Sequence, residues 1–261
     1  MISEIIEVND LVTHYGACKV LDGINLTIYQ GEIMVIIGGS GSGKSTFLHY
    51  LLGLSRPTSG SIRLLGKDIT KLKEHDMLPL RKQMGVAFQG GALFNSMTVG
   101  ENVQLPLREH TKLDERTMRI MTRMKLEVVN LSGFENFMPA ELSGGMIKRA
   151  ALARALIMDP KLLFFDEPSA GLDPVVAAEL DELILHLRDA MRMTIVVVTH
   201  ELDSAYKIAD RITILDKGKI LMTGTVNEVR SSDNERIQDL LNRRPCRESV
   251  DPEEYFQRLT L

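Results

Sequence analysis

The feature that most constrains this chain is a glycine-rich loop between a short apolar run and a helical segment. Ile33–Ile37 is continuously apolar, as in a strand that is buried on both faces of a sheet, and residues 44–52 are predicted to form a helix. Glycines let the backbone curl so that successive N–H groups face a phosphate chain, and the helix start adds a favourable dipole. The loop reads Gly38-Gly39-Ser40-Gly41-Ser42-Gly43-Lys44-Ser45. This P-loop pattern predicts a phosphate-binding site. The alternative is a glycine-rich turn that binds no ligand.

Other segments of strand length surround this loop. They are Ile5–Val8, Ile24–Tyr29, Ile62–Leu65, Leu162–Phe165 and Ile195–Val198. Residues 175–191 carry apolar side chains at helical spacing between the last two runs, and residues 233–242 predict one more helix. The alternation of strand, helix and strand predicts an α/β sandwich.

The middle of the chain has a different pattern. Residues 98–158 contain several helical stretches and no segment that predicts a strand, so we interpret residues 90–158 as a helical insertion in the α/β core. One stretch carries Met118, Met121 and Met124 in steps of three. We interpret this row as core packing rather than as a groove for a partner.

Composition limits the functional classes. The 261 residues carry a net charge of −4, which argues against a dedicated nucleic-acid binder because such proteins usually show a basic stripe. The start of the chain has no secretory-signal pattern, and the longest apolar runs are far shorter than the roughly 20 residues of a membrane span. If the protein works at a membrane, we expect another chain to span it.

Two carboxylates follow the apolar run at 162–165. Asp166 and Glu167 stand at the C-terminal end of a predicted strand, where ligands bind in open α/β sheets. Asp166 is expected to hold Mg²⁺, and Glu167 to orient and polarise an attacking water. Either residue alone could be an acidic helix cap before Pro168. Together with an intact P-loop, the pair predicts phosphoryl transfer.

A second anion-seeking helix start lies about a hundred residues after the P-loop. Ser143, Gly144 and Gly145 precede an alanine-rich helical segment, and they offer a hydroxyl, exposed N–H groups and a positive dipole end. In isolation this triplet could be a simple N-cap.

These motifs, in this order, resemble ATP-binding subunits of ATP-binding-cassette (ABC) transporters along nearly the whole chain. The family's signature stands here as Leu142-Ser143-Gly144-Gly145-Met146, with Met146 where glutamine is usual. Tyr15 falls where an aromatic ring stacks on adenine, Gln89 at the Q-loop, and His200 at the switch histidine. The D-loop matches Ser169-Ala170-Gly171-Leu172-Asp173. The resemblance implies a RecA-like P-loop NTPase core with an antiparallel β-subdomain and an inserted helical subdomain.

The resemblance also implies the roles of these residues toward ATP and Mg²⁺. Lys44, Glu167 and His200 are expected to be catalytic, and Ser45, Gln89 and Asp166 to serve the metal. The expected nucleotide-binding set is Tyr15, Gly38, Gly39, Ser40, Gly41, Ser42, Gly43, Lys44, Ser45, Thr46, Gln89, Ser143, Gly144, Gly145 and Asp173. Met146 is expected to have at most a modest effect, because Ser143 and the backbone supply the main contacts.

In this family two copies pair head to tail, so that Ser143 and Gly145 of one copy close on the γ-phosphate held by Lys44 of the other. The resemblance therefore implies a homodimer, with Asp173 acting across the seam and Gln89 linking the site to the helical insertion. A helix of a separate membrane permease is expected to dock on that insertion.

A narrower resemblance concerns the cargo. Segments at 91–94, 106–110 and 138–146, the last including Met146, look like the ATPases of Mla-type (Mce-associated) phospholipid transporters. This implies work at the cytoplasmic side of a bacterial inner membrane, with a Mce-type lipid-binding protein and a small STAS-domain subunit as further partners. Residues 1–244 would form the ATPase domain. Residues 245–261 would form a C-terminal extension whose deletion weakens dimerisation or partner binding.

Two alternatives remain beside phospholipid transport. The same kind of subunit could serve an importer of a polar solute such as an amino acid. A non-transport ABC ATPase of translation or DNA repair is the third reading, although the chain has neither tandem cassettes nor a long coiled coil.

Overall fold

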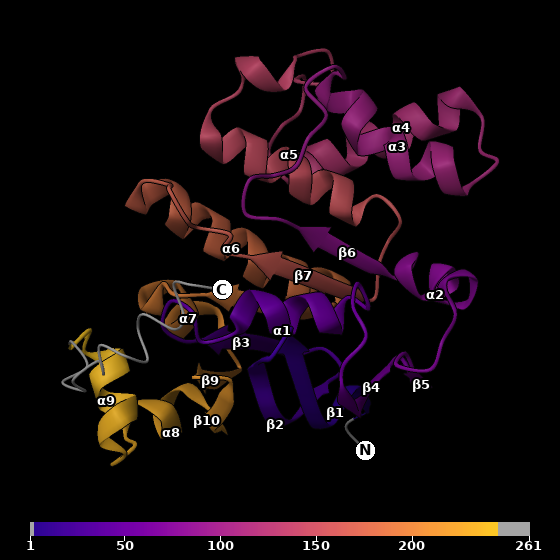
Figure 1. Ribbon diagram of the computed structural model, residues 1–261. Coiled ribbons are helices and arrows are strands. Elements are labelled where there is room, and N and C mark those ends of the chain that lie inside the picture. Colours follow the sequence, from indigo (N-terminus) through magenta and orange to yellow (C-terminus); the bar gives the residue numbers. More distant parts are fainter. Residues whose placement is uncertain (1–2, 245–261) are drawn as a thin grey trace.

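The computed structural model describes residues 3–244 of the chain. Its centre is a six-stranded sheet with the strand order β10-β9-β3-β8-β7-β6 (Figure 1). Five neighbouring strands run parallel, and β10 pairs antiparallel at one edge. The strands are β3 Ile33–Ile37, β6 Met84–Ala87, β7 Leu162–Asp166, β8 Thr194–Thr199, β9 Arg211–Asp216 and β10 Lys219–Gly224. The predicted α/β fold with a P-loop core is confirmed.

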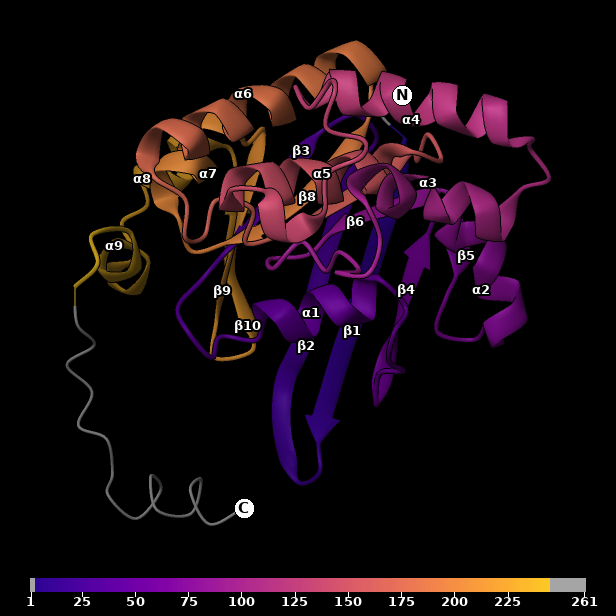
Figure 2. The ribbon, with the colours of Figure 1, turned by 90° about the horizontal axis from the view of Figure 1, so that it is seen from above.

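A smaller antiparallel sheet covers one side of this centre. Its strand order is β2-β1-β4-β5, and the long hairpin of β1 and β2 extends away from the helices (Figure 2). The strands are β1 Glu4–Tyr15, β2 Cys18–Tyr29, β4 Ser59–Leu64 and β5 Lys67–Asp68. Helix α1 (Lys44–Leu51) lies between the two sheets, since its Phe47 and Leu48 pack in the same core as residues of both.

Helices cover the other face of the central sheet. They are α6 Pro174–Met191, α7 Leu202–Ile208 and, from the helical insertion, α5 Gly144–Leu156. The insertion also comprises α3 Val99–His110 and α4 Glu115–Val128, which pack on α5, and the short 3-10 helix Pro139–Glu141. Helix α2 (Glu74–Arg81) precedes β6, and α8 (Val226–Arg230) and α9 (Glu235–Leu241) close the described chain. Figure 1 shows α3, α4 and α5 gathered on one side of α6 and β7.

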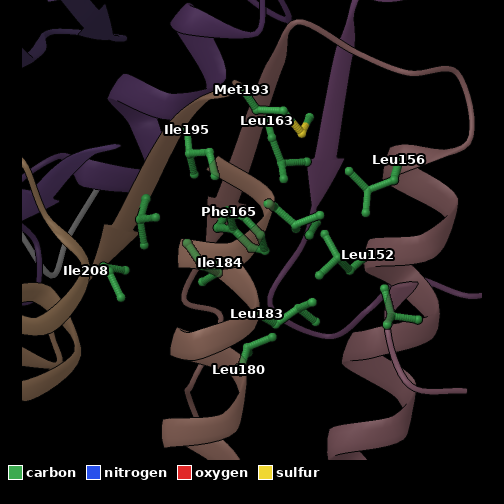
Figure 3. Packing of buried hydrophobic residues seen from close by; sticks show 14 of the residues in the cluster. Leu152, Leu156, Leu163, Phe165, Leu180, Leu183, Ile184, Met193, Ile195 and Ile208 are labelled. Carbon is green, nitrogen blue, oxygen red and sulfur yellow. The ribbon is translucent and has the colours of Figure 1, made fainter. Parts of the chain in front are cut away.

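The alternation of side chains in the central strands divides the core into two clusters. Leu163 and Phe165 of β7 face the helices, whereas Leu162 and Phe164 face α1 and the smaller sheet. Figure 3 shows Leu163 and Phe165 meeting side chains from α5 and α6. Burial on both faces explains why β7 is a continuous apolar run, which ends at the two consecutive carboxylates Asp166 and Glu167.

Several sequence-based bounds need correction. The two N-terminal strands are each 12 residues long, much longer than the apolar stretches that predicted them, because only one face of each is fully buried. The methionine row is only partly core: Met118 is buried and Met121 packs against the core, but Met124 is 59% exposed. The predicted extension at 245–261 lies outside the described residues.

Candidate functional site

The P-loop joins β3 to α1 through backbone that only glycine accepts easily. A Cβ atom on Gly38 would lie 2.1 Å from the carbonyl oxygen of Leu215 on β9, which is far inside van der Waals contact. Gly41 and Gly43 adopt φ values of +72° and +103°, in the left-handed region that favours glycine. Gly43 directly precedes the first turn of α1, so the loop feeds its N–H groups toward a helix start.

Lys44 places its ammonium group against this loop. Its Nζ donates to the carbonyl oxygens of Gly38 at 2.8 Å and Gly39 at 3.0 Å. Burial lowers the pKa of the Lys44 ammonium, and the charges of Glu167 and Asp166 partly oppose that shift. A phosphate entering the loop can therefore compete with two neutral carbonyls for a partly desolvated cation.

Asp166 ends β7 with an unsatisfied acceptor. Its Oδ1 atom is buried and has no hydrogen-bond partner among the described groups. Burial raises the pKa of this carboxyl, and the charge of Glu167 raises it further, while His49 and Lys44 act in the opposite sense. A buried carboxylate oxygen without a donor is a group for which a bound cation would supply the missing partner.

Glu167 is held by several donors from the end of β8. Its Oε2 atom accepts hydrogen bonds from the Thr199 hydroxyl at 3.1 Å and the His200 backbone N–H at 3.3 Å, and His200 Nδ1 lies 2.9 Å away. Glu167 has φ of +49°, an uncommon conformation for a residue with a side chain, and its own N–H donates to Val198. The backbone is thus turned at the point where the carboxylate meets His200.

The structure therefore gathers Lys44, Asp166, Glu167 and His200, from three separate segments, at one end of the parallel strands. Residues 21–170, which include three of these four, match the ABC transporter family. The chain belongs to this family. It is accordingly a nucleotide-binding ATPase, and the family resemblance noted from the motifs is confirmed.

Relatives of this ABC ATPase extend along most of its length. The intermembrane phospholipid transport system ATP-binding protein MlaF of Haemophilus influenzae is 40% identical over 92% of this chain and 91% of its own length. MlaF of Escherichia coli K12 is 39% identical over 92% of this chain and 90% of its own. The protein mkl of Mycobacterium tuberculosis H37Rv, described as a probable ribonucleotide transport ATP-binding protein, is 42% identical over 92% of this chain and 67% of its own.

Solved structures of similar proteins agree with the fold. A dimeric ATP-binding cassette in a post-hydrolysis state, bound to ADP and Pi, has a TM-score of 0.79 at 30% identity, covering 85% of this chain and 99% of its own. The protein cbiO1 of Clostridium perfringens, part of the ABC transporter complex cbiONQ, has a TM-score of 0.82 at 28% identity and covers 99% of both chains.

The signature residues of this ABC ATPase lie at the tip of α5. The Ser143 hydroxyl accepts a hydrogen bond from the Met146 N–H at 3.3 Å, while Ser143 and Gly144 are exposed. A Cβ on Gly145 would lie 2.6 Å from Val176 on α6, so glycine permits close packing there. The Met146 side chain is partly buried and packs against the core.

The other predicted residues have varied surroundings. Tyr15 ends β1 and is 55% exposed, and Gln89 is exposed just after β6. Asp173 caps α6, because its Oδ1 accepts from the N–H groups of Val175 and Val176, each at 3.1 Å. That contact gives Asp173 a structural role that the motif did not indicate.

Motif reasoning missed one lysine beside the site. Lys148 on α5 donates to three backbone carbonyls in the loop that begins at Glu167. These hydrogen bonds join segments about twenty residues apart, so no local sequence pattern predicts them.

Within residues 3–244, no helix is both long enough and apolar enough to cross a membrane.

Proposed function

We propose that this ABC ATPase powers phospholipid transport between the inner and outer membranes of a bacterium. The observation that supports this proposal best is the similarity to proteins named for intermembrane phospholipid transport, at 39–40% identity over 92% of this chain and 90–91% of their length. The subunit would act at the cytoplasmic side of the inner membrane, as a peripheral partner of a permease.

A second candidate function is transport of a polar solute. It is favoured by the mycobacterial mkl proteins, which are 41–42% identical and carry the description of ribonucleotide transport. Identity alone does not separate the two candidates. Coverage supports the first, because the alignment spans only 67% of the first mkl proteins and 91% of Haemophilus MlaF.

The residues of the site fit a Mg²⁺ ion that arrives with the nucleotide. Magnesium sites in such enzymes use one or two carboxylates and complete their shell with phosphates and water. The buried, unpartnered Oδ1 of Asp166 supplies the carboxylate, and Ser45 and Gln89 are proposed to add side-chain oxygens. Bound Mg²⁺ neutralises charge on the phosphates.

Hydrolysis is proposed to use the remaining polar groups in fixed roles. Lys44 exchanges the carbonyls of Gly38 and Gly39 for phosphate oxygens. The donors to Glu167 in the described chain converge on Oε2, which leaves Oε1 to accept a hydrogen bond from the attacking water. His200, with a side chain 56% exposed, can turn toward the γ-phosphate. Catalysis then rests on orientation and charge.

The site is proposed to be completed by a second copy. Ser143 and Gly144 are exposed at the start of a 13-residue helix, and a phosphate is a suitable partner for such a start. A relative of known structure is a dimer with ADP and Pi, which supports pairing of two copies around nucleotide. The γ-phosphate would then join the two copies and its release would let them part.

A groove beside the helical insertion is the proposed seat of the permease. It has a volume of about 470 Å³, and Leu78 and Phe88 on its wall are 42% and 39% exposed. His110 and Pro106 from the Mla-like segment also line it. A membrane-partner helix with apolar side chains would cover these exposed groups. A Mce-type lipid-binding protein and a STAS-domain subunit are the further proposed members of the complex.

The test is recovery of the tagged full chain from detergent-solubilised bacterial membranes. We expect it to bring down a permease chain together with phospholipid above the amount in a mock purification from untagged cells. Leu78→Asp should lose the membrane partners because it places a charge in the groove. The matched variant Leu54→Asp, at an apolar position 54% exposed and outside the groove lining, should keep them.

Recovery of membrane chains without phospholipid enrichment, but with ribonucleotide uptake by vesicles holding the complex, would decide for the polar-solute function. Recovery of no membrane protein under conditions that preserve a known transporter would refute both candidates. Equal recovery with Leu78→Asp would refute only the assignment of the groove.

A further inference from the structure

Lys148 binds the backbone of the loop that carries Glu167, whereas Lys44 binds the backbone of the P-loop. Its Nζ donates to the carbonyl oxygens of Pro168 at 2.6 Å, Ala170 at 2.7 Å and Glu167 at 3.2 Å. Burial lowers the pKa of the Lys148 ammonium, although the nearby charge of Glu167 raises it. All three hydrogen-bonding directions of the ammonium group are thus used on main-chain oxygens. Such charge-assisted bonds are stronger than neutral ones.

The three hydrogen bonds from Lys148 hold the backbone segment that carries the Glu167 carboxylate. The Glu167 N–H is held on the other side by the carbonyl of Val198 on β8, at 2.8 Å. Between these two anchors the residue keeps φ of +49°, which costs free energy and persists only when surrounding contacts impose it. Lys148 therefore acts on the orientation of Glu167 without touching its carboxylate.

Helix α5 brings Lys148 to this loop and also carries the exposed Ser143 tip. Thirteen residues give α5 a length of about 20 Å at 1.5 Å per residue. Farther along the same helix, Arg154 donates to the carbonyls of Gly91 at 2.8 Å and Ala92 at 2.7 Å, just after Gln89. Helix α5 is therefore hydrogen-bonded both to the loop that begins at Glu167 and to the segment that follows Gln89.

We infer that Lys148 is a positioning residue for hydrolysis: it holds the Glu167–Ala170 backbone against α5, so that Glu167 is aligned for catalysis only while α5 is docked. The inference rests on the proposed role of Glu167 and extends it to the helix whose tip serves the second copy. A purely structural role is the competing account, in which Lys148 only strengthens the packing of α5 on β7.

The two accounts differ in the separation of turnover from binding. The hydrogen bonds of Lys148 in the described chain go to residues 167–170 and none goes to residues 38–45, so its loss should leave nucleotide affinity within about twofold of the parental value. Turnover should fall at least about tenfold in Lys148→Met, which keeps the chain length but has no donor, since each tenfold step corresponds to only about 1.4 kcal/mol of barrier. Lys148→Arg, with several donors, should restore turnover to within about threefold, and Lys148→Gln should lie between.

The experiment measures kcat and KM for ATP hydrolysis by the full chain, nucleotide affinity by calorimetry, and Tm for each variant. Lys125→Met is the matched control, because Lys125 lies on α4 of the same insertion and pairs with Asp159 rather than with the Glu167 loop. It should match the parental protein in kcat and in nucleotide affinity. If Lys148→Met does not fold, the order of kcat among Lys148, the Arg variant and the Gln variant decides.

Unchanged kcat in Lys148→Met would overturn the inference. Parallel loss of affinity, turnover and Tm, with no recovery in Lys148→Arg, would also overturn it in favour of the structural account. If instead the parental chain hydrolyses ATP and Glu167→Gln hydrolyses it equally fast, the proposed role of Glu167 has failed first, and the two failures are distinguishable.

Discussion

Replacement of Glu167 by glutamine isolates the chemistry of one carboxylate from the shape of the site. The amide has nearly the same size, and its oxygen can occupy the position of Oε2, where Thr199 and His200 donate their hydrogen bonds. The amide nitrogen must then take the place of Oε1. It presents N–H donors to the attacking water, which needs an acceptor, so orientation of the water is reversed although the fold is unchanged.

The size of the effect follows from what the variant retains. Lys44 and the P-loop keep their contacts, and Asp166 loses the repulsion from its charged neighbour, so nucleotide binding should persist. Loss of a positioned proton acceptor typically costs a factor of about 10²–10⁴ in rate, which corresponds to about 3–5 kcal/mol of barrier. Because the γ-phosphate is no longer cleaved, the closed dimer should accumulate with ATP.

The assay combines steady-state ATP hydrolysis with sedimentation velocity in the presence and absence of ATP. Glu182→Gln is the control, since it makes the same change of charge on α6 at a side chain 68% exposed. It should hydrolyse ATP at the parental rate. Turnover by Glu167→Gln within about threefold of the parental rate would refute Glu167 as the proton acceptor. Low turnover without an ATP-dependent dimer would refute the proposed pairing of two copies.

Two further predictions concern stability. Gly38→Ala should lower the free energy of unfolding by about 1–3 kcal/mol and abolish nucleotide binding, because its Cβ would lie 2.1 Å from the backbone oxygen of Leu215; urea denaturation with unchanged stability would contradict this. Burial raises the pKa of the Asp181 carboxyl more than the hydrogen bond from the Ser204 hydroxyl lowers it. The free-energy cost of burying the ionised carboxylate is therefore fully present above the raised pKa. This cost disappears as the pH falls toward the ordinary pKa range of an aspartate. Asp181→Asn, whose amide oxygen can still accept a hydrogen bond from Ser204, should therefore raise the free energy of unfolding at pH 7 more than at pH 4. A decrease of the free energy of unfolding by more than about 1 kcal/mol at pH 7 would contradict this prediction.

The parts of the fold that the sequence predicted well are those encoded by neighbouring residues. β7 and β8 are buried on both faces, so their apolar runs are unbroken and mark their positions closely. The P-loop is equally local, because a phosphate must be surrounded by consecutive N–H groups. β6, β9 and β10 were not predicted: β6 has only four residues, and β10 at the sheet edge has mostly half-buried side chains without a clear apolar pattern.

The candidate site likewise has residues that the local sequence predicts and contacts that it does not predict. Its charged residues could be proposed from motifs, because Lys44 follows its glycines directly and Asp166 follows its strand directly. The contacts that orient these residues could not, since they join distant positions: Thr199 to Glu167, and Lys148 to Pro168. Their donors are ordinary residues whose role depends on the packing of β8 and α5 beside β7.

The positive φ of Glu167 shows why the contacts between distant residues matter for function. An uncommon backbone conformation is not selected by the local sequence, so it must be maintained by contacts from outside, here by Val198 on one side and Lys148 on the other. The β8 contact belongs to the central sheet, whereas the α5 contact belongs to the helical insertion. On the inferred role of Lys148, a change in the position of α5 would act on Glu167 rather than on the P-loop. On this geometry, docking of a partner against the insertion would change the rate of hydrolysis more than the affinity for nucleotide.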